Sequence, residues 1–294
     1  TSGAGAYGML ADTNSAIFNM GADSIVTTGD GAHGMVAVNV SSADNSGSIT
    51  TSGTGSYGMM VSGTSTGTNS GDIFTSGTDG WGMVAIGTGS SVASSGTITT
   101  TGASGWGMVA TAGASAENSG AIVTSGDASH GMIAINGSTA TNLVSGDITT
   151  TGAGSHGMVA SNNGSVATNY GDIVTNGNGA YGMLAENGSE AFNMGADSIV
   201  TWGAGAHGMV AINVSSADNS GSITTNGDNA FGMLAETDSF AANSGTIVTN
   251  GMGSHGMVAS DDSVATNSGS ITTNNFNSNG MLATDQSSVT NSGS

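Results

Sequence analysis

The sequence predicts an all-β fold, namely a parallel β-helix of about 12 coils with 24–26 residues and three short strands per coil. A ring-Gly-Met-aliphatic-Ala motif recurs along the chain, and its methionines lie 24 to 26 residues apart. Each repeat also contains three segments that alternate with period two between turn residues and are too short for helices. Repeats of this length are typical of solenoids, in which each unit contacts only its neighbours.

The first strand of each coil carries the ring-Gly-Met motif, as in residues 33–37, HGMVA. Neighbouring residues of a strand point to opposite faces, so the methionine and the following aliphatic residue cannot both face inward. We expect Met and Ala inward, because Met adapts to an irregular core. The aliphatic residues would then form an exposed contact stripe, unless a bulge or another segment covers it: Leu10, Val36, Met60, Val84, Val109, Ile133, Val159, Leu184, Val210, Leu234, Val258 and Leu282.

The second strand reads small-x-Asn-x-Gly, as in residues 43–47, and its asparagine recurs at one position of successive coils. Coils stacked in register lie about 4.8 Å apart, so equal positions form ladders along the axis. A stacked carboxamide donates to one neighbour and accepts from the other. The repetition therefore predicts a buried, satisfied asparagine ladder.

The third strand reads Ile-x-Thr-x-Gly, as in residues 49–53. Its isoleucines are predicted to form an inward ladder. The threonine two residues later shares that face, and we expect its hydroxyl to bond to the backbone or to a neighbouring coil.

Ring side chains occupy the position before the Gly-Met pair in eleven coils, and Asn279 takes it in the twelfth. Stacked rings pack favourably, and the following glycine would leave room for them. A sealed corner is the simpler interpretation, and stacking against sugars or lateral association is the functional alternative. The predicted ring ladder comprises Tyr7, His33, Tyr57, Trp81, Trp106, His130, His156, Tyr181, His207, Phe231 and His255.

Two of these rings, His130 and His156, lie on adjacent coils and are weak candidates for a metal site. No carboxylate recurs beside them at ligand spacing, so ring packing is the preferred interpretation. Asp147 and Asp172 would also stack on neighbouring coils, where adventitious Ca²⁺ could bridge them. The glycine-rich nonapeptide of calcium-binding β-rolls is absent, and no cofactor is expected.

The composition narrows the classes of function. The chain has 20 acidic residues, no Lys or Arg and a formal charge of −20, so a nucleic-acid partner is not expected. It has no cysteine and no apolar run long enough for a transmembrane helix. No catalytic constellation emerges, and we expect no enzyme activity. Variation beside the repeated threonines makes a regular ice-binding face a distant alternative.

The repeats resemble those in passenger regions of bacterial autotransporters and related large surface adhesins. The similarity is carried by runs such as NSGSITTSGTGSYGMMVSG at 45–63 and NSGTIVTNGMGSHGMVAS at 243–260. It covers essentially the whole chain. The resemblance implies a right-handed β-helix displayed outside a Gram-negative cell, with a role in adhesion, aggregation or surface structure. Methionine in place of the family's isoleucine is a departure.

Residues 1–294 are expected to form one uncapped β-solenoid array, either a segment of a longer repeat protein or a protomer that stacks head to tail. Residues 1–53 match 175–227 closely, at an offset of 174. We therefore predict an extracellular, cell-surface fibre that is structural or adhesive and associates with itself, end to end or through the stripe. Glycans or other cells are possible partners. A glycan- or ice-binding module is the alternative.

Overall fold

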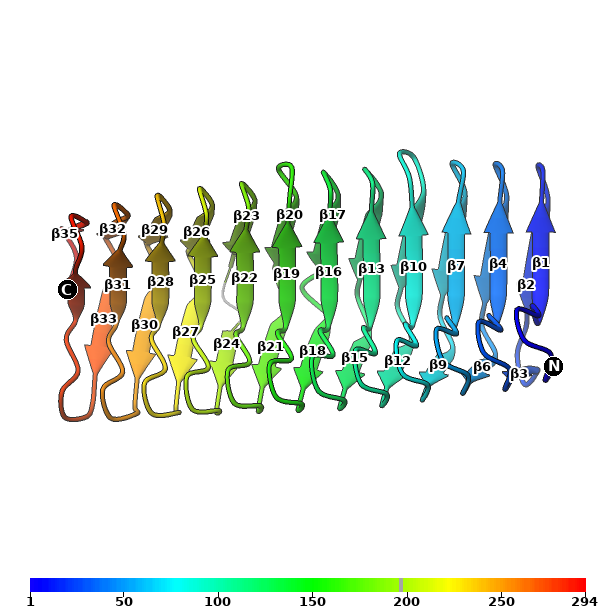
Figure 1. The fold of residues 1–294 in the computed structure, drawn as a ribbon, viewed down its shortest axis with the longest axis horizontal. Helices are drawn as coiled ribbons and strands as arrows, with labels where there is room; N and C mark the ends of the chain where they lie inside the picture. Colours follow the sequence, from blue (N-terminus) through cyan, green and yellow to red (C-terminus); the bar gives the residue numbers. More distant parts are fainter. Residues whose placement is uncertain (196–197) are drawn as a thin grey trace.

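The computed structural model describes residues 1–195 and 198–294, and these residues form a straight stack of coils (Figure 1). The coils contribute strands to three parallel sheets, which we name A, B and C in chain order, and the last coil that the structure describes contributes to A and B alone. Within the described residues, the sheets contain 12, 12 and 11 strands. The predicted parallel β-helix is therefore confirmed.

Sheet A contains the strands that begin at the repeated methionines. Its strands are β1 (Met9–Asp12), β4 (Met35–Val38), β7 (Met59–Ser62), β10 (Met83–Ile86), β13 (Met108–Thr111), β16 (Met132–Ile135), β19 (Met158–Ser161), β22 (Met183–Glu186), β25 (Met209–Ile212), β28 (Met233–Glu236), β31 (Met257–Ser260) and β34 (Met281–Ala283).

Sheet B contains the strands that end at the repeated asparagines, with Ser94 in the place of asparagine in β11. Its strands are β2 (Ala16–Asn19), β5 (Ser42–Asn45), β8 (Thr66–Asn69), β11 (Ser91–Ser94), β14 (Ser115–Asn118), β17 (Thr139–Asn142), β20 (Val166–Asn169), β23 (Glu190–Asn193), β26 (Ser216–Asn219), β29 (Phe240–Asn243), β32 (Val264–Asn267) and β35 (Ser288–Asn291).

Sheet C contains the Ile-x-Thr strands. Its strands are β3 (Ser24–Thr27), β6 (Ser48–Thr51), β9 (Asp72–Thr75), β12 (Thr97–Thr100), β15 (Ala121–Thr124), β18 (Asp147–Thr150), β21 (Asp172–Thr175), β24 (Ser198–Thr201), β27 (Ser222–Thr225), β30 (Thr246–Thr249) and β33 (Ser270–Thr273).

The register of all three sheets places equal repeat positions beside each other. Met83 pairs with Met108 in sheet A, and Ile98 pairs with Ile122 in sheet C. The core of a coil is correspondingly simple. Methionine and alanine point inward from sheet A, alanine from sheet B and isoleucine from sheet C, and they form one continuous buried cluster.

Polar ladders close two corners of this core, as the sequence predicts. Asn118 Nδ2 donates to Asn142 Oδ1 at 2.8 Å, and Asn142 Nδ2 donates to Asn169 Oδ1 at 2.9 Å. The inward threonines donate to a backbone carbonyl five residues later, as from Thr75 to Gly80 at 2.8 Å. Repetition therefore supplies the contacts that satisfy these asparagines and threonines, whereas within the described residues the buried hydroxyl of Ser189 has no hydrogen-bond partner.

The glycine after each ring has a different role from the expected one. A Cβ on Gly58 would lie 2.3 Å from Ile73 Cγ2 and 2.7 Å from the carbonyl oxygen of Gly82. The glycine therefore gives space to the inward isoleucine and to the backbone of the next coil, and not chiefly to the rings.

Candidate functional site: the outer face of sheet B

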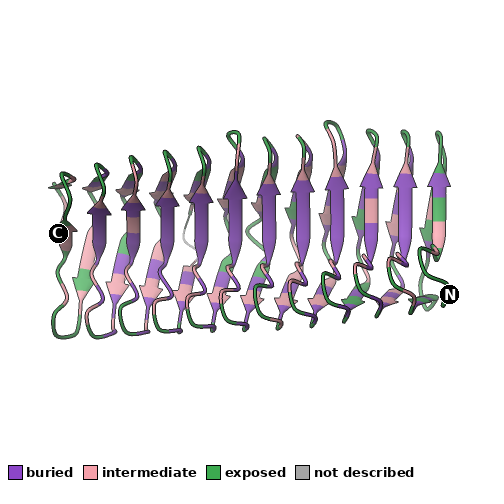
Figure 2. Ribbon diagram, in the orientation of Figure 1, coloured by how far each residue is buried: buried purple, intermediate pink, exposed green. Residues whose placement is uncertain are grey.

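The aliphatic stripe on sheet A is not exposed, which corrects the sequence-based expectation. Met and Ala do face inward, and the stripe faces outward, yet most of the stripe is buried, and Figure 2 shows the strands of sheet A coloured mostly as buried. Leu10 is exposed, whereas Met60, Leu234 and Leu282 are half-buried. The other members are buried: Val36, Val84, Val109, Ile133, Val159, Leu184, Val210 and Val258.

Around the middle of the stripe, ring side chains and aliphatic residues two positions after the stripe form a covering layer. Ile133, Val159, Leu184 and Val210 form a cluster of their own on the outer side of sheet A. Trp106, Tyr181, Ile135 and Ile212 pack against this cluster. Neither a bulge nor a foreign segment is needed to bury the stripe, because the repeat supplies its own cover.

The ring ladder is continuous from Tyr7 to His255. Centroids of successive rings lie 4.5 to 5.9 Å apart, and most pairs are stacked. Most of its members are half-buried, and His207 is buried. The rings therefore seal a corner, which was the simpler of the two sequence-based interpretations.

All five histidines of the ladder accept a backbone hydrogen bond from the next coil. His130 Nδ1 accepts from the N–H of His156 at 3.0 Å, and His156 Nδ1 accepts from the N–H of Tyr181 at 2.9 Å. His33, His207 and His255 make the equivalent contacts. Tyr, Trp and Phe carry no such acceptor on the ring, so histidine supplies a bond that they cannot.

These contacts favour the neutral imidazole. Burial lowers the pKa of His130 and of His207 to about 4, and burial together with His130 lowers the pKa of His156 to about 3. Burial also lowers the pKa of His33 and His255.

The weak metal-site candidates, His130 and His156, gain no further ligands from their surroundings. Their rings stack with centroids 4.8 Å apart, and each uses Nδ1 as a hydrogen-bond acceptor. Over residues 1–195 and 198–294, no three His, Cys, Asp or Glu side chains gather closely enough to hold a metal ion. Asp147 and Asp172 pair across β18 and β21 as expected. In that same part of the chain, no helix has the length and apolar character needed to cross a membrane.

Sheet B presents a different outer face, which the sequence reasoning did not single out. Its outward positions are the first and third residues of each strand, and no ring layer covers them. Their chemistry varies from coil to coil, in contrast to the fixed positions of the core. This variation within a regular repeat is the signal that could have identified the face. The third positions are Phe18, Asp44, Thr68, Ala93, Glu117, Thr141, Thr168, Phe192, Asp218, Ala242, Thr266 and Thr290.

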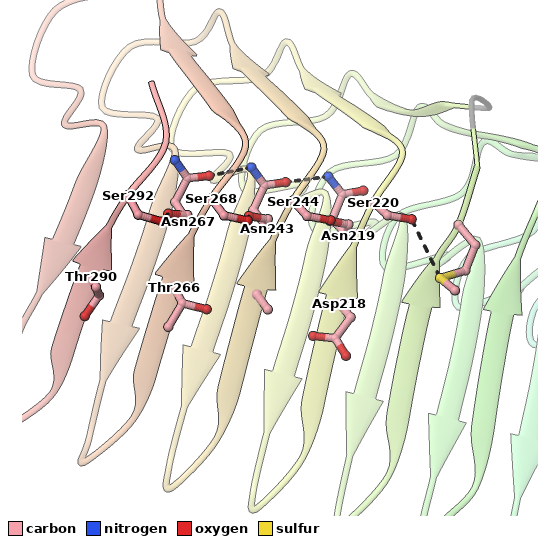
Figure 3. A pocket seen from close by; sticks show the side chains of 12 residues that line it. Asp218, Asn219, Ser220, Asn243, Ser244, Thr266, Asn267, Ser268, Thr290 and Ser292 are labelled. Atoms are coloured by element: carbon pink, nitrogen blue, oxygen red, sulfur yellow. Dashed lines mark hydrogen bonds between the residues drawn. The ribbon is translucent and has the colours of Figure 1, made fainter.

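Hollows occur along both edges of this face. At the B–C edge, one hollow extends over coils from Met194 to Ser292, and others lie over Phe18 to Ser70 and over Thr68 to Leu143. Figure 3 shows the first of these, in which Asp218, Thr266 and Thr290 lie on the outer face. At the A–B edge, hollows lie around Val40 and around Val214. Sheet B is therefore a long surface of mixed polar and apolar character with hollows along both edges.

Comparisons with known proteins agree with this architecture. The family model of the BigA third pectate lyase-like domain matches residues 1–118, 41–146, 93–196 and 183–294. A chain in the cryo-EM structure of the Vag8–C1 inhibitor complex superposes with a TM-score of 0.73 and 17% sequence identity, over 98% of this chain and 78% of that chain. The search of curated proteins found no match to this chain.

Proposed function

Because the chain belongs to the family of the BigA third pectate lyase-like domain, we propose that it is a surface-displayed β-helical rod that binds partners through the outer face of sheet B. The rod is extracellular and adhesive, and it acts through non-covalent contacts without a catalytic step. One observation carries the proposal: sheet B is uncovered and bordered by grooves, whereas sheet A is closed by its own rings.

The uncovered face combines two features that favour protein or glycan recognition. It carries aromatic and aliphatic side chains, such as Phe18, Phe240 and Val264, among hydroxyl and carboxylate groups. Hollows beside it can take up side chains of a partner. Binding surfaces often combine a few apolar anchors with polar groups in this way.

Lateral self-association through the aliphatic stripe does not belong to this proposal, because most of the stripe is buried. The solved complex of Vag8 with C1 inhibitor provides a parallel of architecture alone. A binding role for this chain therefore rests on its own sheet B.

Adhesion of beads coated with the purified chain tests the proposal. Beads are incubated with cultured epithelial cells, with and without enzymatic removal of cell-surface glycans. A T141R/T168R variant places two arginines on sheet B, and a matched T149R/V174R variant places them on sheet C of the same two coils. All four positions are half-buried outward sites.

We expect the sheet B variant to lose adhesion and the sheet C variant to retain it. Equal losses in both variants, or no adhesion of the unmodified chain, would contradict the proposal. Loss of adhesion after glycan removal would identify glycans as the partner, and unchanged adhesion would identify protein.

A further inference from the structure

The internal duplication of 174 residues brings two similar surface patches onto sheet B. Patch N consists of Phe18, Met20, Val40 and Asp44, and patch C consists of their equivalents, Phe192, Met194, Val214 and Asp218. Patch N lies over β2 and β5, and patch C lies over β23 and β26.

Each patch has one hollow at the A–B edge of sheet B and a second hollow at the B–C edge. The hollow at Val40 also contains Ser15 and Ser42, and the hollow at Val214 contains their equivalents, Ser189 and Ser216. On the opposite edge, Met20 and Asp44 line one hollow, whereas Met194 and Asp218 line another. Figure 3 shows the Asp218 side chain within the last of these. The duplication has therefore preserved a surface as well as a fold.

The valines of the two patches are unusual for the backbone that they occupy. Val40 has a φ of 64° and Val214 a φ of 62°, and their exposed fractions are 60% and 69%. A β-branched residue with positive φ is strained, and exposure of its side chain returns no burial. Nearby turns place the polar residues Asn14, Asp238 and Thr64 at positive φ, and of these only Thr64 is β-branched. Neither valine gains much burial in return for this strain, which favours a role in contact with a partner.

The carboxylates of the patches have no cation within the chain, because the sequence contains no Lys or Arg. Asp44 accepts a hydrogen bond from the hydroxyl of Thr68, whereas Asp218 faces Ala242 at the equivalent position. Burial, and then the nearby Glu190, raise the pKa of Asp218. A positive charge at this place would oppose that shift, because an opposite charge favours the ionised carboxylate.

We propose that patch N and patch C are two equivalent docking sites for a basic polypeptide segment of a partner protein. In each site, apolar side chains of the segment contact the phenylalanine, methionine and valine, and a Lys or Arg side chain pairs with the aspartate. This inference rests on the proposed function and names its partner. A second copy of this chain does not fit, because it has no cationic side chain to supply.

The spacing of the sites makes binding bivalent. β5 and β26 are seven strands apart in sheet B, so the patches lie about 34 Å apart at the usual strand spacing. A flexible Gly/Ser linker of about 40 residues has a root-mean-square length of about 35 Å. Two segments joined by such a linker can occupy both patches, and linkage then increases the overall affinity.

Fluorescence anisotropy with synthetic peptides tests the inference. The probes are an alternating Lys-Leu octapeptide and a tandem of two such octapeptides joined by the 40-residue linker. We expect the tandem to bind the complete chain at least about tenfold more tightly than the single octapeptide, which binds with a stoichiometry of two.

Variants in one patch sharpen the test. Val40→Asn combined with Asp44→Asn removes the apolar and charged contacts of patch N, and Asn tolerates positive φ, so the fold is kept. We expect the stoichiometry of the octapeptide to fall from two to one and the tandem to lose its advantage. Val144→Asn combined with Asp79→Asn is the matched control, because it changes an exposed valine and an exposed aspartate outside both patches.

Equal affinities of tandem and octapeptide, or equal effects of the patch N variant and the control, would overturn the inference. The bead experiment keeps this failure separate from failure of the proposed function. Adhesion that depends on sheet B without patch-dependent peptide binding would leave sheet B as the binding face and remove the two basic-segment sites.

Discussion

Sheets A and B are built from strands of equal length in equal register, yet their outer sides differ. Outside sheet A, ring side chains accompany the aliphatic stripe in nearly every coil, and most of the stripe residues are buried. Outside sheet B, the side chains vary and remain accessible between two grooves. Uniformity in this repeat therefore marks packing, and variation marks a surface that is free to bind.

The largest effect on stability is expected from substitution of buried stripe residues on sheet A. In a V84N/V109N/I133N variant, each site loses roughly 1.5–3 kcal/mol of apolar burial and gains a buried amide that costs about 1–3 kcal/mol. We expect unfolding of the central coils, measured by circular dichroism and limited proteolysis.

The matched variant A93N/E117N/T141N places the same residues on sheet B of the same coils. We expect each of its changes to alter stability by less than about 0.5 kcal/mol. Similar destabilisation of both variants would mean that the outer sides of the two sheets are equivalent.

The second largest effect is expected from acid, which should destabilise the side of the molecule that carries the ring ladder. The folded-state pKa values of His130, His156 and His207 lie below their unfolded value, so below about pH 6.5 the unfolded chain binds protons that the folded chain does not. The free energy of unfolding therefore contains the full contribution of these histidines above that pH, and this contribution decreases as the pH falls towards 4. Each of these histidines contributes about 1.4 kcal/mol per pH unit.

Urea unfolding at pH 7.5, 6 and 5 measures this loss. A His156→Phe variant keeps a ring in the ladder and removes one proton-binding site, so its stability should depend less steeply on pH. An equal slope in the variant and the parent chain would assign the acid sensitivity to the carboxylates.

The asparagine ladder behind sheet B should show a smaller effect. Asn142→Ala removes the acceptor of Asn118 and the donor to Asn169, and we expect a loss of about 2 kcal/mol. Asn142→Ser should cost about half as much, because Ser94 already accepts from Asn69 at 3.1 Å in the fourth coil. Thermal unfolding of both variants checks the order, and a serine variant that is no more stable than the alanine variant would contradict it.

The smallest expected effect is a gain in stability at the edge of sheet B. Val214→Asn relieves a β-branched residue of its positive φ, and we expect a gain of about 1 kcal/mol. Val144, which is exposed but does not have positive φ, should give no gain on the same substitution. A loss of stability at Val214 would show that the valine packs favourably in the folded chain.

The sequence predicted the fold because every ladder repeats. The period, the methionine, asparagine and isoleucine positions, and the resemblance to autotransporter passengers and large surface adhesins are confirmed. The stripe faces outward as predicted, but the prediction that it is exposed was wrong. Alternation along a strand predicts that the Val84 side chain points outward, and it does not predict which side chains cover it. The hollows beside Val40 and Val214 depend on turn geometry, which the repeat alone does not specify.

The repeated register also has a mechanical consequence. Each coil is joined to the next by nearly the same backbone bonds, asparagine contact and ring contact. When the rod is pulled by its ends, coils should therefore detach one at a time at similar forces. Each event releases about 25 residues, or about 85 Å of extended chain. Such a rod lengthens in equal steps under load and limits the tension that reaches a contact on its surface.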